Sequence, residues 1–200
     1  MRQIVVVGED DLCCALGERL VSQTLPTWRL AVEPISTEGV SRLISDIPRY
    51  VRQARHLHPV LCVADTDKGC AVELRNKWLA AERHDKFVLR LVVTEAESWL
   101  LADSCALSSF LRIPRTKIPK LPDLEADPKR VMLTLARRSK SRLFRDELVS
   151  PSDHSKQGSG YNTHLTEFVR KHWDAGRAAS ASPSLARAIP RVRALGETHA

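Results

Sequence analysis

The 200-residue chain lacks several features that would assign it to a membrane or secreted class. It contains no run of about 18 apolar residues, so we expect no membrane span. Its first residues lead directly into a strand-like segment followed by acids, which is not the pattern of a signal peptide. These absences predict a cytoplasmic protein.

Motifs for common cofactors are also missing. The five cysteines include no CxxC pair, so we expect neither a disulfide framework nor a zinc site. The chain has no GxxxxGK[ST] segment, no GxGxxG after its first strand, and no evident Ser-His-Asp set. The chain therefore has no nucleotide P-loop and none of these cofactor-binding motifs.

Charge is distributed unevenly along the chain, whose formal net charge is +7. Residues 1–103 carry 13 basic and 15 acidic side chains, a net charge of −2, whereas residues 104–200 carry 18 basic and 9 acidic, a net charge of +9. We predict two parts with this boundary: an α/β domain and a basic helical extension packed on it. The basic half is a candidate surface for DNA or RNA.

One short stretch, residues 59–69, organises the first half. Its apolar residues 59–64 predict a buried strand of a parallel sheet, and Asp65 and Asp67 follow directly. Ligands of open α/β sheets bind just beyond the carboxyl ends of the strands. Two carboxylates one residue apart at such an end can share a hard cation such as Mg²⁺.

The first half alternates between strand and helix patterns. We predict strands at about 3–8, 28–32, 59–64 and 87–93. Helices are predicted at about 11–22, 38–55 and 70–83 and from about residue 98, with Pro48 kinking or splitting the second of them. This order gives a four-stranded parallel sheet with helices on both faces.

Acids follow three of the four predicted strands, and parallel strands end at the same edge of a sheet. Close carboxylates repel one another unless a cation or protons balance them. The sequence therefore predicts a Mg²⁺ or Mn²⁺ site at this edge. Its candidate ligands are Glu9, Asp65, Asp67 and Glu97, with Glu95 a weaker candidate.

The second half predicts helices joined by polar connections. Residues 111–122 predict an exposed connection, and Asp127-Pro128-Lys129 predicts a helix start. That helix leads into a basic run, and the predicted nucleic-acid contacts are Lys68, Arg137, Arg138, Lys140 and Arg142.

Toward its end the chain predicts a helix at 161–174, a linker at 175–183 and a last helix at 184–195. Pro190 is expected to interrupt this last helix. Its polar side carries Arg187, Arg191 and Arg193.

Three segments carry a resemblance to a known family. The strand leading to Asp65-Thr66-Asp67 resembles the Toprim (Rossmann-like) domain of topoisomerases, primases and OLD-type nucleases. More narrowly, the segment ending at Cys70, residues 97–103 and the helix start at residue 127 are similar to RloB-related proteins. Those proteins are often encoded beside ATPases in phage-defence operons.

The resemblance implies a Toprim-type, metal-dependent nuclease whose partner is an ATPase. It assigns catalysis to Asp65 and Asp67, with Glu9 taking the place of a missing residue. The family's glutamate directly precedes the glycine after the first strand, where this chain has Val7 before Gly8.

Two other functions fit the residues. The first is a non-catalytic subunit, with a degenerate site, that binds nucleic acid or a partner protein. The second is a phospho-receiver domain with Asp65 as the phosphate acceptor and Thr94 after the fourth strand. Against the receiver, no convincing fifth strand with a lysine at its end follows Thr94.

Overall fold

A computed structural model describes residues 2–197, and the sheet at its centre is parallel throughout. Its strands are β1 (Gln3–Gly8), β2 (Arg29–Leu30), β3 (Ile35–Ser36), β4 (Val60–Asp65) and β5 (Phe87–Val92). Their order is β2-β1-β4-β5, and β3 also pairs with β1. The predicted α/β class with a parallel sheet is therefore confirmed.

The second predicted strand is wrong in its extent. In place of one strand at 28–32, two short strands, β2 and β3, pair with opposite ends of β1. The chain bends between them and passes through Pro34, which has no N–H to give to a ladder. The sheet edge beside β1 is consequently discontinuous.

Helices surround the sheet and make up the second half of the chain. They are α1 (Asp11–Thr24), α2 (Val40–His56), α3 (Ala71–Trp78), α4 (Ala96–Ala102), α5 (Ser104–Leu111), α6 (Pro128–Arg137), α7 (Arg142–Leu148), α8 (Tyr161–Lys171), α9 (Ala175–Ala179) and α10 (Pro183–Glu197). Short 3-10 turns, η1 (Arg115–Lys117) and η2 (Pro122–Leu124), lie between α5 and α6.

Three helix predictions need correction. The predicted linker at 175–183 contains α9, and α3 ends at Trp78 rather than at residue 83. Neither α2 nor α10 is split at its proline. Each proline frees the carbonyl four residues earlier, and Ile44 and Ala186 are exposed, so water can bond to those carbonyls.

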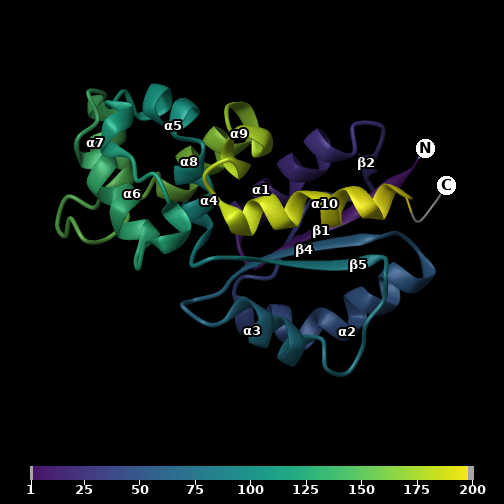
Figure 1. The fold of residues 1–200 in the computed structure, drawn as a ribbon. Helices are drawn as coiled ribbons and strands as arrows, with labels where there is room; N and C mark the ends of the chain where they lie inside the picture. Colours follow the sequence, from purple (N-terminus) through teal and green to yellow (C-terminus); the bar gives the residue numbers. More distant parts are fainter. Residues whose placement is uncertain (1, 198–200) are drawn as a thin grey trace.

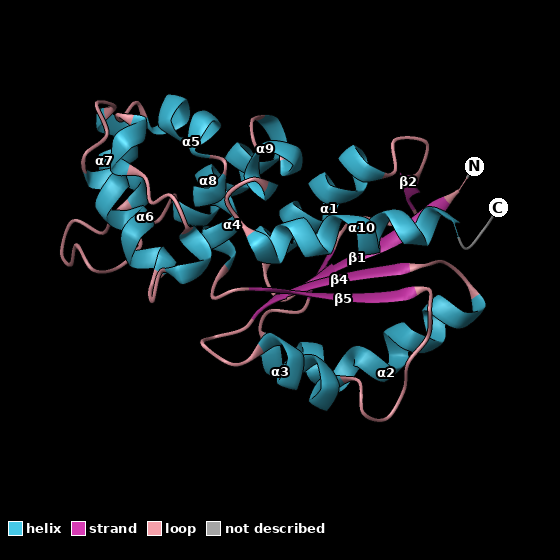
Figure 2. Ribbon diagram, viewed as in Figure 1, coloured by secondary structure: helices cyan, strands magenta, loops and turns pink. Residues whose placement is uncertain are grey.

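The sheet separates two layers of helices (Figures 1 and 2). Helices α2 and α3 cover one face, and α1 and α10 cover the other. Alternate side chains of each strand enter different cores, as the pleat requires: Val5 and Val7 pack toward α2, and Val6 packs toward α1. Both faces of the central strands are therefore buried.

Residues of the second half share the larger core with the sheet. Helix α8 packs on α1, α9 packs on α4, and α10 contacts both α1 and β5. The indole N–H of Trp173 donates to the carbonyl of Trp99 at 2.8 Å, and the indole N–H of Trp99 donates to Ser184 at 2.8 Å. This packing brings α6 and α8 to the carboxyl edge of the sheet.

Candidate functional site

The carboxyl edge of the sheet gathers the acids that the sequence placed after three strands. Glu9 follows β1, Asp65 is the last residue of β4, and Glu97 lies in the first turn of α4 just after β5. Since β4 pairs with both β1 and β5 in parallel, these three strands end on the same side of the sheet (Figure 1), and the three acids lie at that end. We call Glu9, Asp65, Asp67 and Glu97 the acidic edge.

Asp65 lies between the first helix and the first strand end. Its backbone N–H donates to Oε2 of Glu9 at 3.1 Å. The thiol of Cys13 approaches Oδ1 of Asp65 at 3.8 Å. Asp10 caps α1 by accepting from the N–H of Cys13 at 2.8 Å.

The loop after β4 is fixed to the loop after β5. The carbonyl of Thr94 accepts from the backbone N–H groups of Thr66 and Asp67, at 3.1 and 3.2 Å. Asp67 and Lys68 both adopt a left-handed backbone, with φ of 46° and 70°. Such conformations are uncommon without glycine and persist where the surroundings determine them. The turn therefore holds Asp67 next to Asp65.

Two residues of the second half complete the acidic edge. Glu97 is only 2% exposed, and its Oε1 accepts from the Tyr161 hydroxyl of α8 at 2.8 Å. Lys129 Nζ of α6 lies 3.9 Å from the same oxygen, and the Lys129 backbone N–H donates to Glu95 at 3.0 Å. The helical half thus supplies a cation and a phenol to acids of the sheet.

Burial and mutual repulsion make these carboxyls resist ionisation. Burial, together with the negative charges of Glu97, Glu9, Asp10 and Asp67, raises the pKa of Asp65 to about 9. Burial likewise raises the pKa values of Glu9 and Glu97. The acidic edge therefore carries more carboxyls than the chain's own positive charge balances.

The carboxyls of the acidic edge also shift the pKa of Lys129. Burial alone would lower the pKa of its ammonium, but the charges of Glu97, Glu95, Asp65 and Asp10 outweigh that effect and raise it. The lysine thus stays charged and offsets part of the excess negative charge, while its pKa shift shows that it interacts with Asp65 as well as with Glu97.

The donor chemistry fits a hard divalent cation, because the acidic edge offers carboxylate oxygens only. Within residues 2–197, however, no three or more His, Cys, Asp or Glu side chains form a group that could hold a metal ion. Glu9 and Glu97 instead accept hydrogen bonds from Asp65 and Tyr161. Cation binding would require these side chains to turn toward a common point.

The predicted nucleic-acid contacts lie outside the acidic edge, with one exception. Lys68 is exposed and directly follows Asp67. Arg137, Arg138 and Lys140 are exposed at or just after the far end of α6, roughly 12 Å of helix from Lys129. Arg142 pairs with Asp146 at 3.2 Å.

The sequence placed Lys129 and Tyr161 at the starts of two predicted helices, without a role at the acidic edge. The Asp127-Pro128 cap signalled where α6 begins, and the structure confirms it, with Asp127 accepting from the N–H of Arg130. Nothing in the spacing showed that this helix start lies against Glu97. Only the packing of the two halves brings Lys129 and Tyr161 to the sheet.

In the phospho-receiver alternative, Thr94 is the threonine that follows the fourth predicted strand. Its hydroxyl donates to the carbonyl of Glu125 at 3.2 Å rather than to Asp65.

Among the helices described between residues 2 and 197, none combines the length and apolar character needed to cross a membrane. Comparisons with protein-family models, curated proteins and solved structures find no match.

Proposed function

We propose that this protein is a divalent-cation-dependent phosphodiesterase that cleaves nucleic acid at the acidic edge. The observation that supports it best is the convergence of four carboxyls on one end of the sheet, where burial and the charges of the other acids together raise the pKa of Asp65 to about 9. A site that holds excess negative charge in a folded chain is suited to binding a cation. The family resemblance of the Asp65-Thr66-Asp67 segment points the same way.

In this proposal Asp65 and Asp67 hold Mg²⁺ or Mn²⁺, with Glu9 and Glu97 contributing oxygens. When bound, the cation supplies a Lewis acid that polarises the phosphodiester and stabilises the leaving oxygen. Glu9 is the candidate general acid or base, because its raised pKa brings proton transfer closer to neutral pH. Lys129 and Lys68 offset phosphate charge beside it.

The position of Val7 supports giving the role of the family's first-strand glutamate to Glu9. The Val7 side chain is fully buried in the core on the α2 side, so a glutamate there could not serve this edge without repacking. Glu9, two residues later, reaches the backbone of Asp65. We therefore assign to Glu9 the role that the family's first-strand glutamate has elsewhere. Gating by an ATPase and a role in phage defence stay part of the proposal.

The test is cleavage of labelled single- and double-stranded DNA and RNA by the pure protein with Mg²⁺ or Mn²⁺. We expect cutting that EDTA abolishes and that the Asp65→Ala/Asp67→Ala variant loses by about 10³-fold or more, since it removes the central cation ligands. A matched control is Asp46→Ala/Glu18→Ala, which removes two acids that lie outside the acidic edge and form ion pairs. Thermal unfolding confirms that both variants fold.

Undiminished cutting by the Asp65→Ala/Asp67→Ala variant would overturn the mechanism. Absence of cutting together with Mn²⁺ binding at these aspartates, measured by calorimetry, would indicate that a partner must activate the protein. Absence of both cutting and Mn²⁺ binding would favour the non-catalytic alternative.

A further inference from the structure

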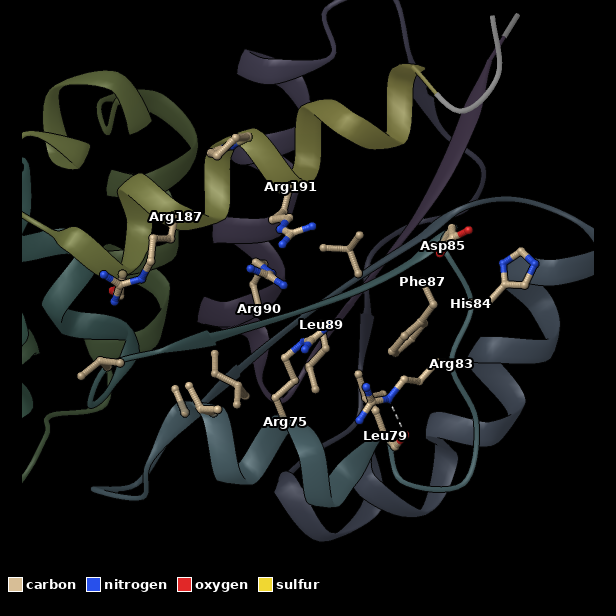
Figure 3. Close-up of a pocket in the computed structure, with 17 residues that line it drawn as sticks. Arg75, Leu79, Arg83, His84, Asp85, Phe87, Leu89, Arg90, Arg187 and Arg191 are labelled. Carbon is tan, nitrogen blue, oxygen red and sulfur yellow. Dashed lines mark hydrogen bonds between the residues drawn. The ribbon is translucent and has the colours of Figure 1, made fainter.

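A second charged site lies along β5, on the outer edge of the sheet. A pocket of about 790 Å³ opens between α3, β5 and α10 (Figure 3). It is lined by five arginines, and the carboxylate of Asp85 is the one acid among its lining residues. We call this set the arginine pocket: Arg75, Arg83, Arg90, Arg187 and Arg191.

Most of these guanidinium groups have no partner in the part of the chain that the structure describes. The side chains of Arg75, Arg90, Arg187 and Arg191 form no ion pair or hydrogen bond with residues 2–197. The guanidinium of Arg83 bonds to the carbonyl of Leu79 and the amide of Asn76, both neutral groups. Elsewhere the chain does pair arginines, for example Arg177 with Asp103.

Arg90 is the member that is hardest to explain as a solvated surface residue. Its Nε is buried and has no hydrogen-bond acceptor among residues 2–197. Burial, with added repulsion from Arg75 and Arg191, lowers the pKa of its guanidinium to about 10. A buried donor without an acceptor is costly, and a buried charge without a counter-ion more so. An anion in the pocket would satisfy both.

The arginines are spread along the strand rather than gathered at one point. Helix α10 runs antiparallel to β5: its first residues lie near Trp99, and Gly196 lies near Arg2. Arg187 is thus closer to the carboxyl edge, Arg90 and Arg191 lie in the middle, and Arg83 is near the start of β5 (Figure 3). Six strand residues span roughly 20 Å.

The pocket leads to the acidic edge. Val93 lines one end of it, and the next residue, Thr94, holds the Thr66-Asp67 turn through its carbonyl. β5 is also the last strand of the sheet and pairs with β4 alone among the described strands. An extended polyanion lying along this strand would therefore reach Asp67.

We propose that the arginine pocket binds the phosphate backbone of a nucleic-acid strand and directs it along β5 toward the acidic edge. Planar guanidinium forks match phosphate oxygens, and a row of them suits a chain of phosphates better than one isolated anion. The direction toward the acidic edge rests on the proposed function, whereas binding itself does not.

The test separates binding from cleavage. Affinity for short fluorescent single-stranded and double-stranded oligonucleotides is measured by anisotropy in EDTA, on the Asp65→Ala/Asp67→Ala background. The test variant is Arg75→Gln/Arg90→Gln/Arg191→Gln. The control, Arg42→Gln/Arg52→Gln/Arg55→Gln, removes the same charge from exposed positions of α2. Circular dichroism and thermal unfolding establish that both fold.

We expect the pocket variant to bind single strands about tenfold to a hundredfold more weakly near 0.1 M salt, and the control to change by less than about threefold. The slope of log affinity against log salt should flatten by about 2, because three phosphate contacts are lost at roughly 0.7 each. The single variant Arg187→Gln, at an exposed position, should lose several-fold and serves if the triple variant does not fold.

Unchanged oligonucleotide affinity and salt slope in the pocket variant would overturn the proposal. So would a variant that keeps its oligonucleotide affinity but loses binding of pyrophosphate or polyglutamate, since the pocket would then serve a small phosphate compound or an acidic protein. If the wild type does not cleave nucleic acid, the binding test still decides this proposal, because affinity is measured without cleavage.

Discussion

The acidic edge and the arginine pocket meet at the carboxyl end of β5 and carry opposite unbalanced charge. At the acidic edge the chain offsets part of the charge itself, through Lys129, the Tyr161 hydroxyl and protons on buried carboxyls. In the arginine pocket the buried Nε of Arg90 has no acceptor within the described chain. We expect both sites to lower the stability of the ligand-free fold and binding of opposite charge to restore it.

A third charged cluster shows what a purely structural arrangement looks like in the same molecule. Asp103 is 1% exposed, and its two oxygens accept from Arg177 at 3.0 and 2.7 Å and from the backbone N–H groups of Ala106 and Asp174. Here both carboxylate oxygens and the guanidinium have partners within the described residues. The contrast suggests a rule for this protein: charge that the chain satisfies itself supports the fold, and charge left unsatisfied is available to a ligand.

The largest effect should come from breaking the satisfied cluster. Asp103→Ala leaves the Arg177 guanidinium without its carboxylate and two backbone N–H groups without acceptors. We expect a loss of about 3 kcal/mol of unfolding free energy and a melting temperature lower by roughly 6–12 °C. Asp46→Ala, which breaks an exposed pair with Arg49, is the control and should cost less than about 1 kcal/mol. Equal losses in the two variants would refute the contrast.

Substitution at the acidic edge should raise the free energy of unfolding rather than lower it. The pKa of Asp65 is about 9 in the fold against 3.8 as a free side chain, so the folded state holds a proton that the unfolded state releases. Stability from this proton is fully present below about pH 4 and is lost as the pH rises toward about 9. Asp65→Asn removes that dependence, because an amide does not titrate.

We therefore expect Asp65→Asn to melt about 4–8 °C above the wild type near pH 8, with the difference vanishing near pH 4. Thermal unfolding across this range in EDTA measures it, with Asp46→Asn as the control. Added Mg²⁺ should raise the melting temperature of the wild type near pH 8 but not that of Asp65→Asn. An Asp65→Asn variant that is less stable than the wild type at every pH would show that Asp65 stabilises the fold.

Substitution in the arginine pocket should also raise the free energy of unfolding, but by less. Arg90→Met keeps the apolar stem and removes a partly buried charge that two other arginines repel. We expect a gain of about 1 kcal/mol, or roughly 2–4 °C, in buffer without multivalent anions. Pyrophosphate should stabilise the wild type more than this variant. Arg52→Met, from the exposed face of α2, is the control, and destabilisation by Arg90→Met would instead indicate an interaction within the fold.

The two sites differ in how far the sequence could predict them. The acidic edge follows from a local pattern, since acids directly after buried strands must meet where parallel strands end. The structure brings Glu9, Asp65, Asp67 and Glu97 to one edge, as the strand order requires. The class of fold was predictable for the same reason, because continuous apolar runs specify buried parallel strands.

The arginine pocket had no such local signal. Its residues come from α3, the loop after α3, β5 and α10, and they meet only because α10 packs back on the sheet after about 90 intervening residues. The sequence did place Arg187 and Arg191 on the polar side of the last helix, but a polar helix side is ordinarily solvated. The contacts of Lys129 and Tyr161 with Glu97 were unpredictable for the same reason, because long-range packing determines their neighbours.

The basic run that the sequence singled out should contribute least. Arg137, Arg138 and Arg142 are exposed at the end of α6 and the start of α7, and Arg142 already pairs with Asp146. Because water solvates these charges, Arg137→Gln/Arg138→Gln/Arg142→Gln should change the unfolding free energy by less than about 0.5 kcal/mol. Single-stranded oligonucleotide affinity should fall by only about threefold, since a groove concentrates the field of its charges more than an open surface does. If this variant instead loses more affinity than the pocket variant, the main phosphate contact lies on α6 and α7, and the row of arginines along β5 serves another anion.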